Sequence, residues 1–160
     1  QAMTRIVAQA ETDKQRNRQK FGCGMQGVQN AETADEKAGS TDASYAIGHA
    51  ACTVAEDIAA KVLIAVTKSG YTARMMSRFM PAQPIIASTT DERAYRSMAL
   101  LWGVIPVMAH ENDNLSSLIK ESMEAACEMG LLREGERAVI SAGIPLHVAG
   151  NTNMIRIETL

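Results

Sequence analysis

The chain has 160 residues, of which 46% are hydrophobic and 4% aromatic, and its formal net charge at pH 7 is −2. This length suits one domain with a mostly aliphatic core, and the slightly acidic charge argues against a broad nucleic-acid surface, which is normally basic. No stretch approaches the roughly 20 apolar residues that cross a bilayer, and the N-terminus lacks a signal-peptide pattern, so we expect a cytoplasmic protein without membrane partners.

The first 44 residues form two segments of different composition. Segment 1–12 has apolar residues on one helical face, with no capping residue before them: Met3, Ile6, Val7 and Ala10. We therefore expect a helix that is the remnant of a preceding domain. Segment 13–44 is polar and glycine-rich without a clear period, which predicts a linker or a poorly ordered segment. A basic patch for an acidic partner is the alternative for its first residues.

The pattern of a globular domain begins at residue 45 and continues to residue 160. In chain order we expect a helix at 45–60, a strand at 62–66, a helix at 71–79, a strand at 84–89, a helix at 90–101, a strand at 104–109, a helix at 115–129, and strands at 138–142 and 152–159. Strands separated by helices predict an α/β fold with an open, mostly parallel five-stranded sheet flanked by helices.

Some residues make this expectation more specific. Pro106 indicates that its strand lies at an edge or carries a bulge, because proline cannot donate to a sheet. The connection before the last strand is too short for a helical crossover, so we expect that strand to be antiparallel to its neighbour. We interpret Trp102 as a core or interface residue, and the methionines of the helix at 115–129, Met123 and Met129, as core residues.

The residues that follow the first strand are the strongest functional signal. Five apolar residues, typical of a strand buried on both faces, run into a polar loop and a helix start: Thr67, Lys68, Ser69, Gly70, Tyr71 and Thr72. This loop offers hydroxyls, an ammonium group and the unpaired N–H groups of a helix N-terminus, which together suit a phosphate group. Its spacing matches neither a P-loop nor a G-x-G-x-x-G motif, so it indicates no nucleoside triphosphatase or dinucleotide site.

The sequence offers no catalytic or metal-binding constellation. A nucleophile elbow is absent, and the adjacent acids Glu56 and Asp57 are expected on an exposed helix face. The cysteines and histidines lack ligand spacing, so we expect reduced thiols and no metal: Cys23, Cys52, Cys127, His49, His110 and His147.

Several motifs, in the right order, resemble the C-terminal domain of the pyruvate kinase family. They are T-K-S-G-Y-T-A-R-M-M-S-R-F-M-P at 67–81, P-I-I-A at 84–87, W-G-V-I-P-V at 102–107, S-A-G-I-P at 141–145 and N-T-N-M-I-R at 151–156. The resemblance covers about residues 45–160, and the ending is similar to that of bacterial members. Segment 1–12 resembles the last helix of the family's catalytic barrel.

This resemblance implies a regulatory and subunit-assembly domain that is not catalytic alone. The family transfers phosphate from phosphoenolpyruvate to ADP with Mg²⁺ and K⁺ in the barrel, so the chain itself would hold no cofactor. By resemblance, residues 67–72 hold the phosphate of a sugar phosphate or nucleoside monophosphate. A later loop closes over this ligand and includes His147, Gly150, Asn151 and Thr152. The implied partners are this effector, the catalytic domain of the same enzyme and further copies of the chain.

Two other functions stay open at this point. Residues 69–72 also resemble the S-G-x-[ST] loop of sugar-isomerase domains, which need a general base beside the sugar. His147 is the candidate for that base, although a loop histidine commonly faces solvent. The other possibility is a purely structural interaction domain, in which the loop serves only to turn the chain.

Overall fold

The computed structural model describes residue 9 and residues 43–110, 114–146 and 150–160. The chain divides into two units, residues 1–37 and 38–160. The expectations for segments 1–12 and 13–44 therefore lie almost entirely outside the described residues. Within these segments Gln9 is helical, and Ala43 and Ser44 already belong to the first helix of the second unit.

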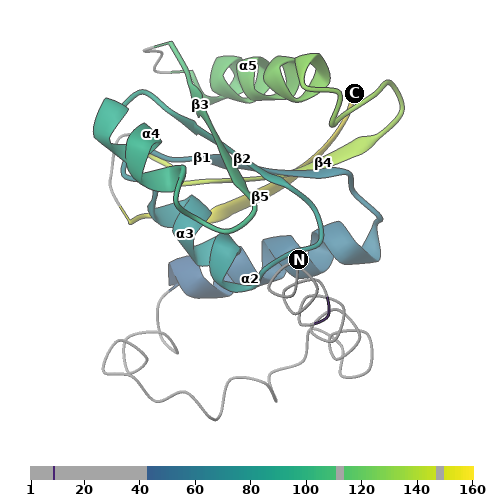
Figure 1. Ribbon diagram of the computed structural model, residues 1–160, viewed down its shortest axis with the longest axis horizontal. Coiled ribbons are helices and arrows are strands. Elements are labelled where there is room, and N and C mark those ends of the chain that lie inside the picture. Colours follow the sequence, from purple (N-terminus) through teal and green to yellow (C-terminus); the bar gives the residue numbers. More distant parts are fainter. Residues whose placement is uncertain (1–8, 10–42, 111–113, 147–149) are drawn as a thin grey trace. The chain divides into compact units, whose positions relative to one another are not determined.

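The second unit alternates helices and strands as the sequence predicts (Figure 1). Its described elements are α2 (Ala43–Asp57), β1 (Val62–Val66), α3 (Tyr71–Arg78), β2 (Ile85–Thr89), α4 (Glu92–Met98), β3 (Val104–Met108), α5 (Leu115–Glu128), β4 (Arg137–Ala142) and β5 (Met154–Thr159). Each observed boundary lies within three residues of the predicted one, which is the usual uncertainty at element ends. None of these helices is long and apolar enough to cross a membrane.

The strands form one sheet in the order β3-β2-β1-β4-β5. The pairs of β1 with β2, β1 with β4 and β2 with β3 are parallel, and β5 is antiparallel to β4, which confirms the predicted mixed sheet. Pro106 lies in β3, which is an edge strand, as its missing N–H group requires. In the register, Val66 pairs with Ser88 on one side and with Ala142 on the other. The three strands therefore end at the same level.

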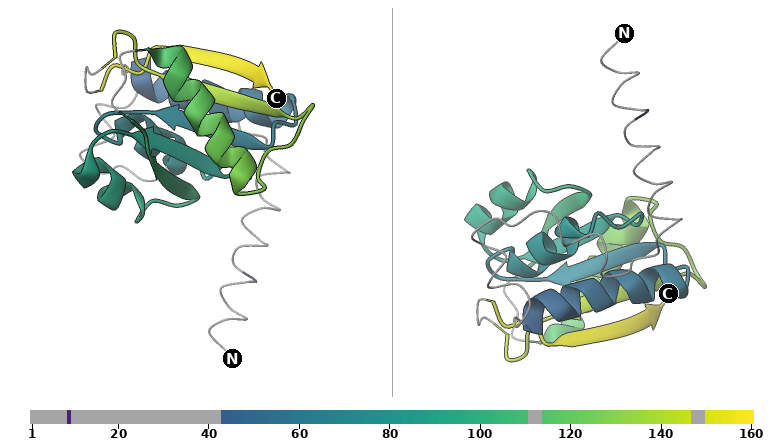
Figure 2. Two further views of the ribbon diagram at one scale, coloured as in Figure 1. Left: turned by 90° about the horizontal axis from the view of Figure 1, so that it is seen from above. Right: turned by 90° about the horizontal axis from the view of Figure 1, so that it is seen from below.

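Helices cover both faces of the sheet, so the central strand is buried on both sides. One core cluster joins α2, α3 and α4 to alternate strand residues such as Leu63 and Ala65. The other joins α5 to the intervening residues, among them Ile64 and Val66. Figure 2 shows α5 and α2 on opposite faces of the sheet. All five residues of β1 are buried, which matches its unbroken apolar run.

Two large side chains are not in the core, which makes the core interpretation of Met129 wrong and leaves the interface as the remaining interpretation of Trp102. Trp102 is 54% exposed, because it lies in the turn between the short helix α4 and the edge strand β3, where none of the described elements covers it. Met129 is 46% exposed, because it is the C-cap of α5 and lies beyond the last turn that faces the sheet. Met123, which lies six residues earlier in α5, is buried as expected.

We expect the central strand to dominate the stability of this unit. Ile64→Ala should lower the free energy of unfolding by about 2–5 kcal/mol, because Ile64 is fully buried against α5 and its truncation leaves a cavity. Urea denaturation followed by circular dichroism measures this loss. Leu100→Ala is the control, since Leu100 is 89% exposed and should change stability by less than about 0.5 kcal/mol. Equal losses in both variants would contradict this view of the core.

Candidate functional site

A cavity of about 40 Å³ lies at the carboxyl ends of β1, β2 and β4, beside α5. Among the described residues that line it, Lys68 is the one charged residue, and no acid or imidazole is present. Most of the remaining polar lining consists of hydroxyl side chains: Thr67, Ser69, Thr72, Ser88, Thr89, Thr90 and Thr152. The position agrees with the general rule that ligands of open α/β sheets bind beyond the strand carboxyl ends.

The loop that follows β1 is held in shape by two of these hydroxyls. Thr67 Oγ1 accepts a hydrogen bond from the Gly70 N–H group at 3.1 Å, within the loop itself. Thr89 Oγ1 donates to the Lys68 carbonyl at 3.2 Å, and so fixes the loop to the end of β2. The side chains of Lys68 and Ser69 stay exposed. The backbone of the loop is therefore fixed before any ligand arrives, and its cationic and hydroxyl side chains remain accessible.

Helix α3 begins at this loop with an N-terminus that has no side-chain cap. Its N-cap residue is Gly70, which has a left-handed φ of 79°. A Cβ atom there would lie 2.9 Å from Met98 Cγ, so both the backbone angle and the close contact favour glycine. Because glycine has no side chain, the N–H groups of the first turn of α3 receive no side-chain acceptor from the cap.

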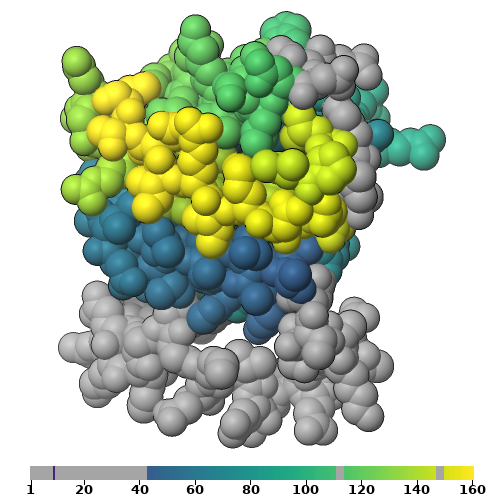
Figure 3. Space-filling model, turned by 180° about the vertical axis from the view of Figure 1, so that it is seen from behind, coloured from purple at the N-terminus to yellow at the C-terminus, as the bar shows by residue number. Residues whose placement is uncertain are grey.

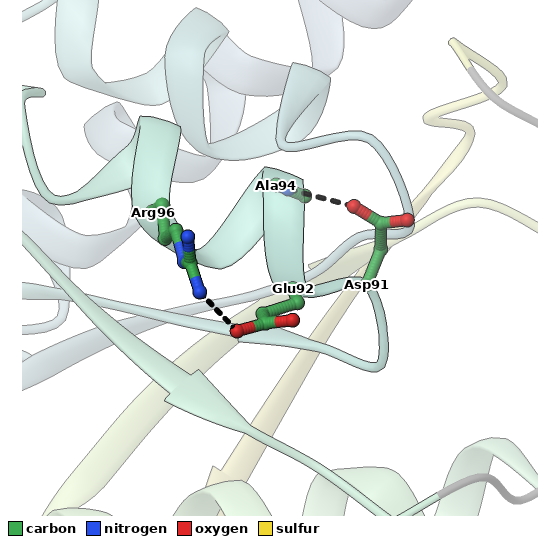
Figure 4. A network of polar contacts seen from close by, with 4 residues as sticks. All are labelled: Asp91, Glu92, Ala94 and Arg96. Atoms are coloured by element: carbon green, nitrogen blue, oxygen red, sulfur yellow. Dashed lines mark hydrogen bonds and ion pairs between the residues drawn. The ribbon is translucent and has the colours of Figure 1, made fainter.

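The next helix, α4, has an N-terminus that is capped by a side chain, in contrast to α3. Asp91 precedes α4, and its carboxylate accepts a hydrogen bond from the Ala94 N–H group at 2.7 Å (Figure 4). Glu92 adds a negative charge in the first turn and pairs with Arg96 one turn later. An aspartate therefore caps the N-terminus of α4, whereas the cap residue of α3 provides no side-chain acceptor.

Residues 150–152 are tied to the first turns of two helices. The hydroxyls of Thr72 in α3 and Thr152 hydrogen-bond at 2.7 Å in a buried position. The Thr152 N–H group donates to Ser44 Oγ in α2 at 3.2 Å, and the Ser44 hydroxyl donates to the Gly150 carbonyl at 2.8 Å. The end of the late loop is thus positioned beside the start of α3, although the two segments are far apart in sequence.

The loop after β4 is also braced at its base. The Asn153 side chain accepts from the Ile144 N–H group at 2.9 Å and donates to the Ile144 carbonyl at 2.6 Å. A Cβ atom on Gly143 would lie 2.2 Å from the Asn151 carbonyl oxygen, so only glycine allows this close approach of the two strand ends. These contacts bring residues 143 and 151 together on the wall of the cavity.

Most of the predicted phosphate residues meet at the cavity. Four of them line it directly, namely Thr67, Lys68, Ser69 and Thr72. Gly70 supplies the helix cap, and Tyr71 is half-buried in the first position of α3 without lining the cavity. Of the predicted late-loop residues, Gly150, Asn151 and Thr152 line the cavity. His147 lies outside the described residues.

Three lining residues at the end of β2 were not predicted: Ser88, Thr89 and Thr90. A signal for them exists in the sequence, because parallel strands that follow one another commonly lie side by side and end at one edge. The run Ser88-Thr89-Thr90 ends the second strand just as Thr67 ends the first. In the described part of the chain no group of three His, Cys, Asp or Glu residues is placed to hold a metal ion.

Comparison with known proteins gives consistent matches. Residues 45–158 match the family model described as pyruvate kinase, alpha/beta domain. A pyruvate kinase of Clostridium acetobutylicum is 32% identical over 158 residues, which is 99% of this chain and 31% of that protein. A pyruvate kinase of Thermotoga maritima is 37% identical over 118 residues, 74% of this chain and 25% of that protein. The chain thus spans less than a third of the length of these relatives.

The buried bond between Thr72 and Thr152 should couple the late loop to α3. Thr72→Val and Thr152→Val should each lower the free energy of unfolding by about 1–3 kcal/mol, because each leaves the other hydroxyl buried and unpaired. The double variant should lose about 0.5–3 kcal/mol less than the sum of the two, measured by urea denaturation. The exposed Thr159→Val is the control for the Thr-to-Val change itself. Strict additivity would show that the two hydroxyls do not interact.

Proposed function

The chain belongs to the pyruvate kinase family and contains its α/β domain, and on this premise we propose that it is a regulatory and subunit-assembly domain that binds a phosphorylated effector. In this role it acts in the cytoplasm beside the catalytic domain of the same enzyme, which converts phosphoenolpyruvate and ADP to pyruvate and ATP. The chain carries out no catalysis alone. Its effector is a sugar phosphate or a nucleoside monophosphate.

The observation that carries this proposal is the arrangement of donors around the start of α3. Lys68 brings a positive charge, and the helix N-terminus adds the equivalent of about half a charge. The N-cap Gly70 brings no side-chain acceptor that would compete for the first-turn N–H groups, and no carboxylate repels an anion from the described lining. A phosphate group offers several acceptor oxygens and suits this set of donors.

The internal hydrogen bonds of the site reduce the conformational entropy that the chain would lose when the effector binds. Thr67 and Thr89 already fix the loop backbone, and Thr152 is already fixed to Thr72. Binding to a preformed site loses less conformational entropy than binding that must order a loop. The effector therefore meets donors that are in place, and most of its interaction energy contributes to affinity.

The far edge of the sheet supports the assembly part of the proposal. Strand β5 pairs only with β4 among the described strands, so its outer backbone groups face no other strand of the sheet. Figure 3 shows β5, in yellow, running along the surface between α5 and α2. Ile157 and Leu160 expose 49% and 41% of their surface there. An open edge with apolar side chains suits pairing with another copy of the chain.

The two alternative functions have less support. An isomerase needs a general base beside the sugar, and its candidate, His147, lies outside the described residues. An assay for interconversion of aldose and ketose phosphates tests this alternative, and measurable turnover would favour it. A purely structural domain would bind none of the phosphorylated compounds.

Removal of the Lys68 ammonium group should weaken effector binding. Lys68→Ala should lower the affinity for glucose 6-phosphate or AMP, whichever binds, by about 10–100-fold in isothermal titration calorimetry, because a charge-assisted hydrogen bond is lost. Lys61→Ala is the matched control, since Lys61 precedes β1 at the opposite end and its change alters net charge equally. Unchanged affinity in Lys68→Ala, or an equal loss in both variants, would refute the site.

A charge on the open edge should disrupt assembly. Ile157→Lys should shift the chain toward the monomer in analytical ultracentrifugation, because it places a hydrated ammonium group on the pairing edge. Leu100→Lys, an equivalent change at an exposed site after α4, should leave the association unchanged. A wild-type chain that stays monomeric, or an assembly indifferent to Ile157→Lys, would contradict assembly through β5.

A further inference from the structure

Ser88 is a buried side chain whose presence neither the fold nor phosphate binding explains. It is 1% exposed, and its Oγ atom has no hydrogen-bond partner among the described residues. A hydroxyl buried without a partner costs free energy, because it gives up its hydrogen bonds to water. Ser88 also lines the cavity at the strand ends, directly below its surface.

The neighbours of Ser88 in the sheet are all apolar. The register places four residues in one row across neighbouring strands and on the same face: Val107, Ser88, Val66 and Ala142. This face packs against α5, whose Leu118 is 4% exposed and also lines the cavity. Alanine or valine at position 88 would complete an apolar floor without an unpaired polar atom. The serine is therefore unfavourable for the fold unless something binds its hydroxyl.

Other buried hydroxyls in the described part of the chain have partners within it. Ser122 donates to the Leu118 carbonyl at 2.6 Å, and Ser77 donates to the Trp102 carbonyl at 2.7 Å. The other buried polar atom without a partner in the described part of the chain is Gln83 Oε1. Gln83 precedes β2, at the amino ends of the parallel strands, and does not line the cavity. Ser88 thus combines a missing partner with a place in the ligand cavity.

Ser88 lies directly beside the loop that is proposed to hold phosphate. Its carbonyl accepts a hydrogen bond from the Thr67 N–H group at 3.0 Å. Lys68 and Ser69 follow Thr67 in the chain, and all three residues line the same cavity as Ser88. One small molecule can therefore place its phosphate on the loop and a nearby polar group on the floor beside Ser88.

We propose that Ser88 is a specificity-determining contact that binds a hydroxyl group of a sugar phosphate close to the phosphorylated carbon. This role depends on the proposed function, because the phosphate at Lys68 brings that hydroxyl to the floor. The apolar row around Ser88 offers a sugar hydroxyl no other side-chain partner on this floor. The Ser88 hydroxyl therefore distinguishes phosphate esters that carry a neighbouring hydroxyl group from esters that do not.

The test compares ligands that differ in their hydroxyl groups. Calorimetric titrations of the 160-residue chain use glucose 6-phosphate and ribose 5-phosphate, and ethyl phosphate as the ester without hydroxyls. Ser88→Ala should lower the affinity for the sugar phosphate that binds by about 3–10-fold, because one neutral hydrogen bond is lost. The affinity for ethyl phosphate should stay unchanged, because this ester has no hydroxyl group to lose that bond. Ser122→Ala removes a buried hydroxyl away from the cavity lining and should change neither affinity.

The ligand-free variant gives a second readout. The melting temperature of Ser88→Ala should equal or exceed that of the wild type, because the substitution removes an unpaired buried hydroxyl. A lower melting temperature would indicate a structural partner, such as a buried water, and would overturn the ligand role.

The possible failures can be told apart. If sugar phosphates bind through Lys68 but Ser88→Ala weakens all esters equally or none of them, the role of Ser88 is refuted and the phosphate site stands. If no phosphate ester binds the wild type, the proposed function fails, and the role of Ser88 fails with it.

Discussion

The parallel register of the three central strands is the constraint on which the site depends. Val66 pairs with Ser88 on one side and with Ala142 on the other, so β1, β2 and β4 end at one level. The chain leaves the sheet at this level three times, and the three following segments meet there. The hydroxyl bond between Thr72 and Thr152, which are 80 residues apart in sequence, forms because of this alignment. A shift of one residue in the register of β2 would move strand side chains such as Ser88 to the other face of the sheet.

The polar groups at the carboxyl ends of β1, β2 and β4 serve two different purposes. One set bonds internally and fixes the backbone, as Thr89 does for the Lys68 carbonyl. The other set is the one proposed to bind the ligand, and it includes the exposed Lys68 and Ser69 and the buried Ser88. A fixed loop with unsatisfied donors is typical of a binding site that is formed before its ligand arrives. The same division explains why α4 has an aspartate cap and α3 has a glycine.

Much of the fold could be predicted because its signals are local. Five consecutive apolar residues identified β1 as buried, Pro106 placed β3 at an edge, and the short connection after β4 made β5 antiparallel. The loop at residues 67–72 could be recognised from its own residue types. Exposure was harder to predict, because Trp102 and Met129 lie where the covering elements end, and residue type does not encode that place.

The remaining part of the site depends on contacts between distant segments. Ser44 accepts a hydrogen bond from Thr152, which lies 108 residues later, and a local sequence pattern cannot predict such a pair. The importance of Ser88 appears only when the strand register shows an apolar row around it and the hydrogen bonds show that it has no partner. Sequence patterns located the loop that we propose to bind phosphate, whereas packing revealed the part of the cavity around Ser88.

The most direct test of the central claim is an amide chemical-shift titration of the ¹⁵N-labelled chain with a sugar phosphate. If the strand ends form the binding site, the largest shifts should fall on residues 67–73, 88–90 and 150–152, with the N–H groups at the start of α3 foremost. Chemical-shift changes confined to other surfaces would show that the carboxyl ends of the strands do not bind the phosphate. The absence of any change at millimolar ligand concentrations would show the same.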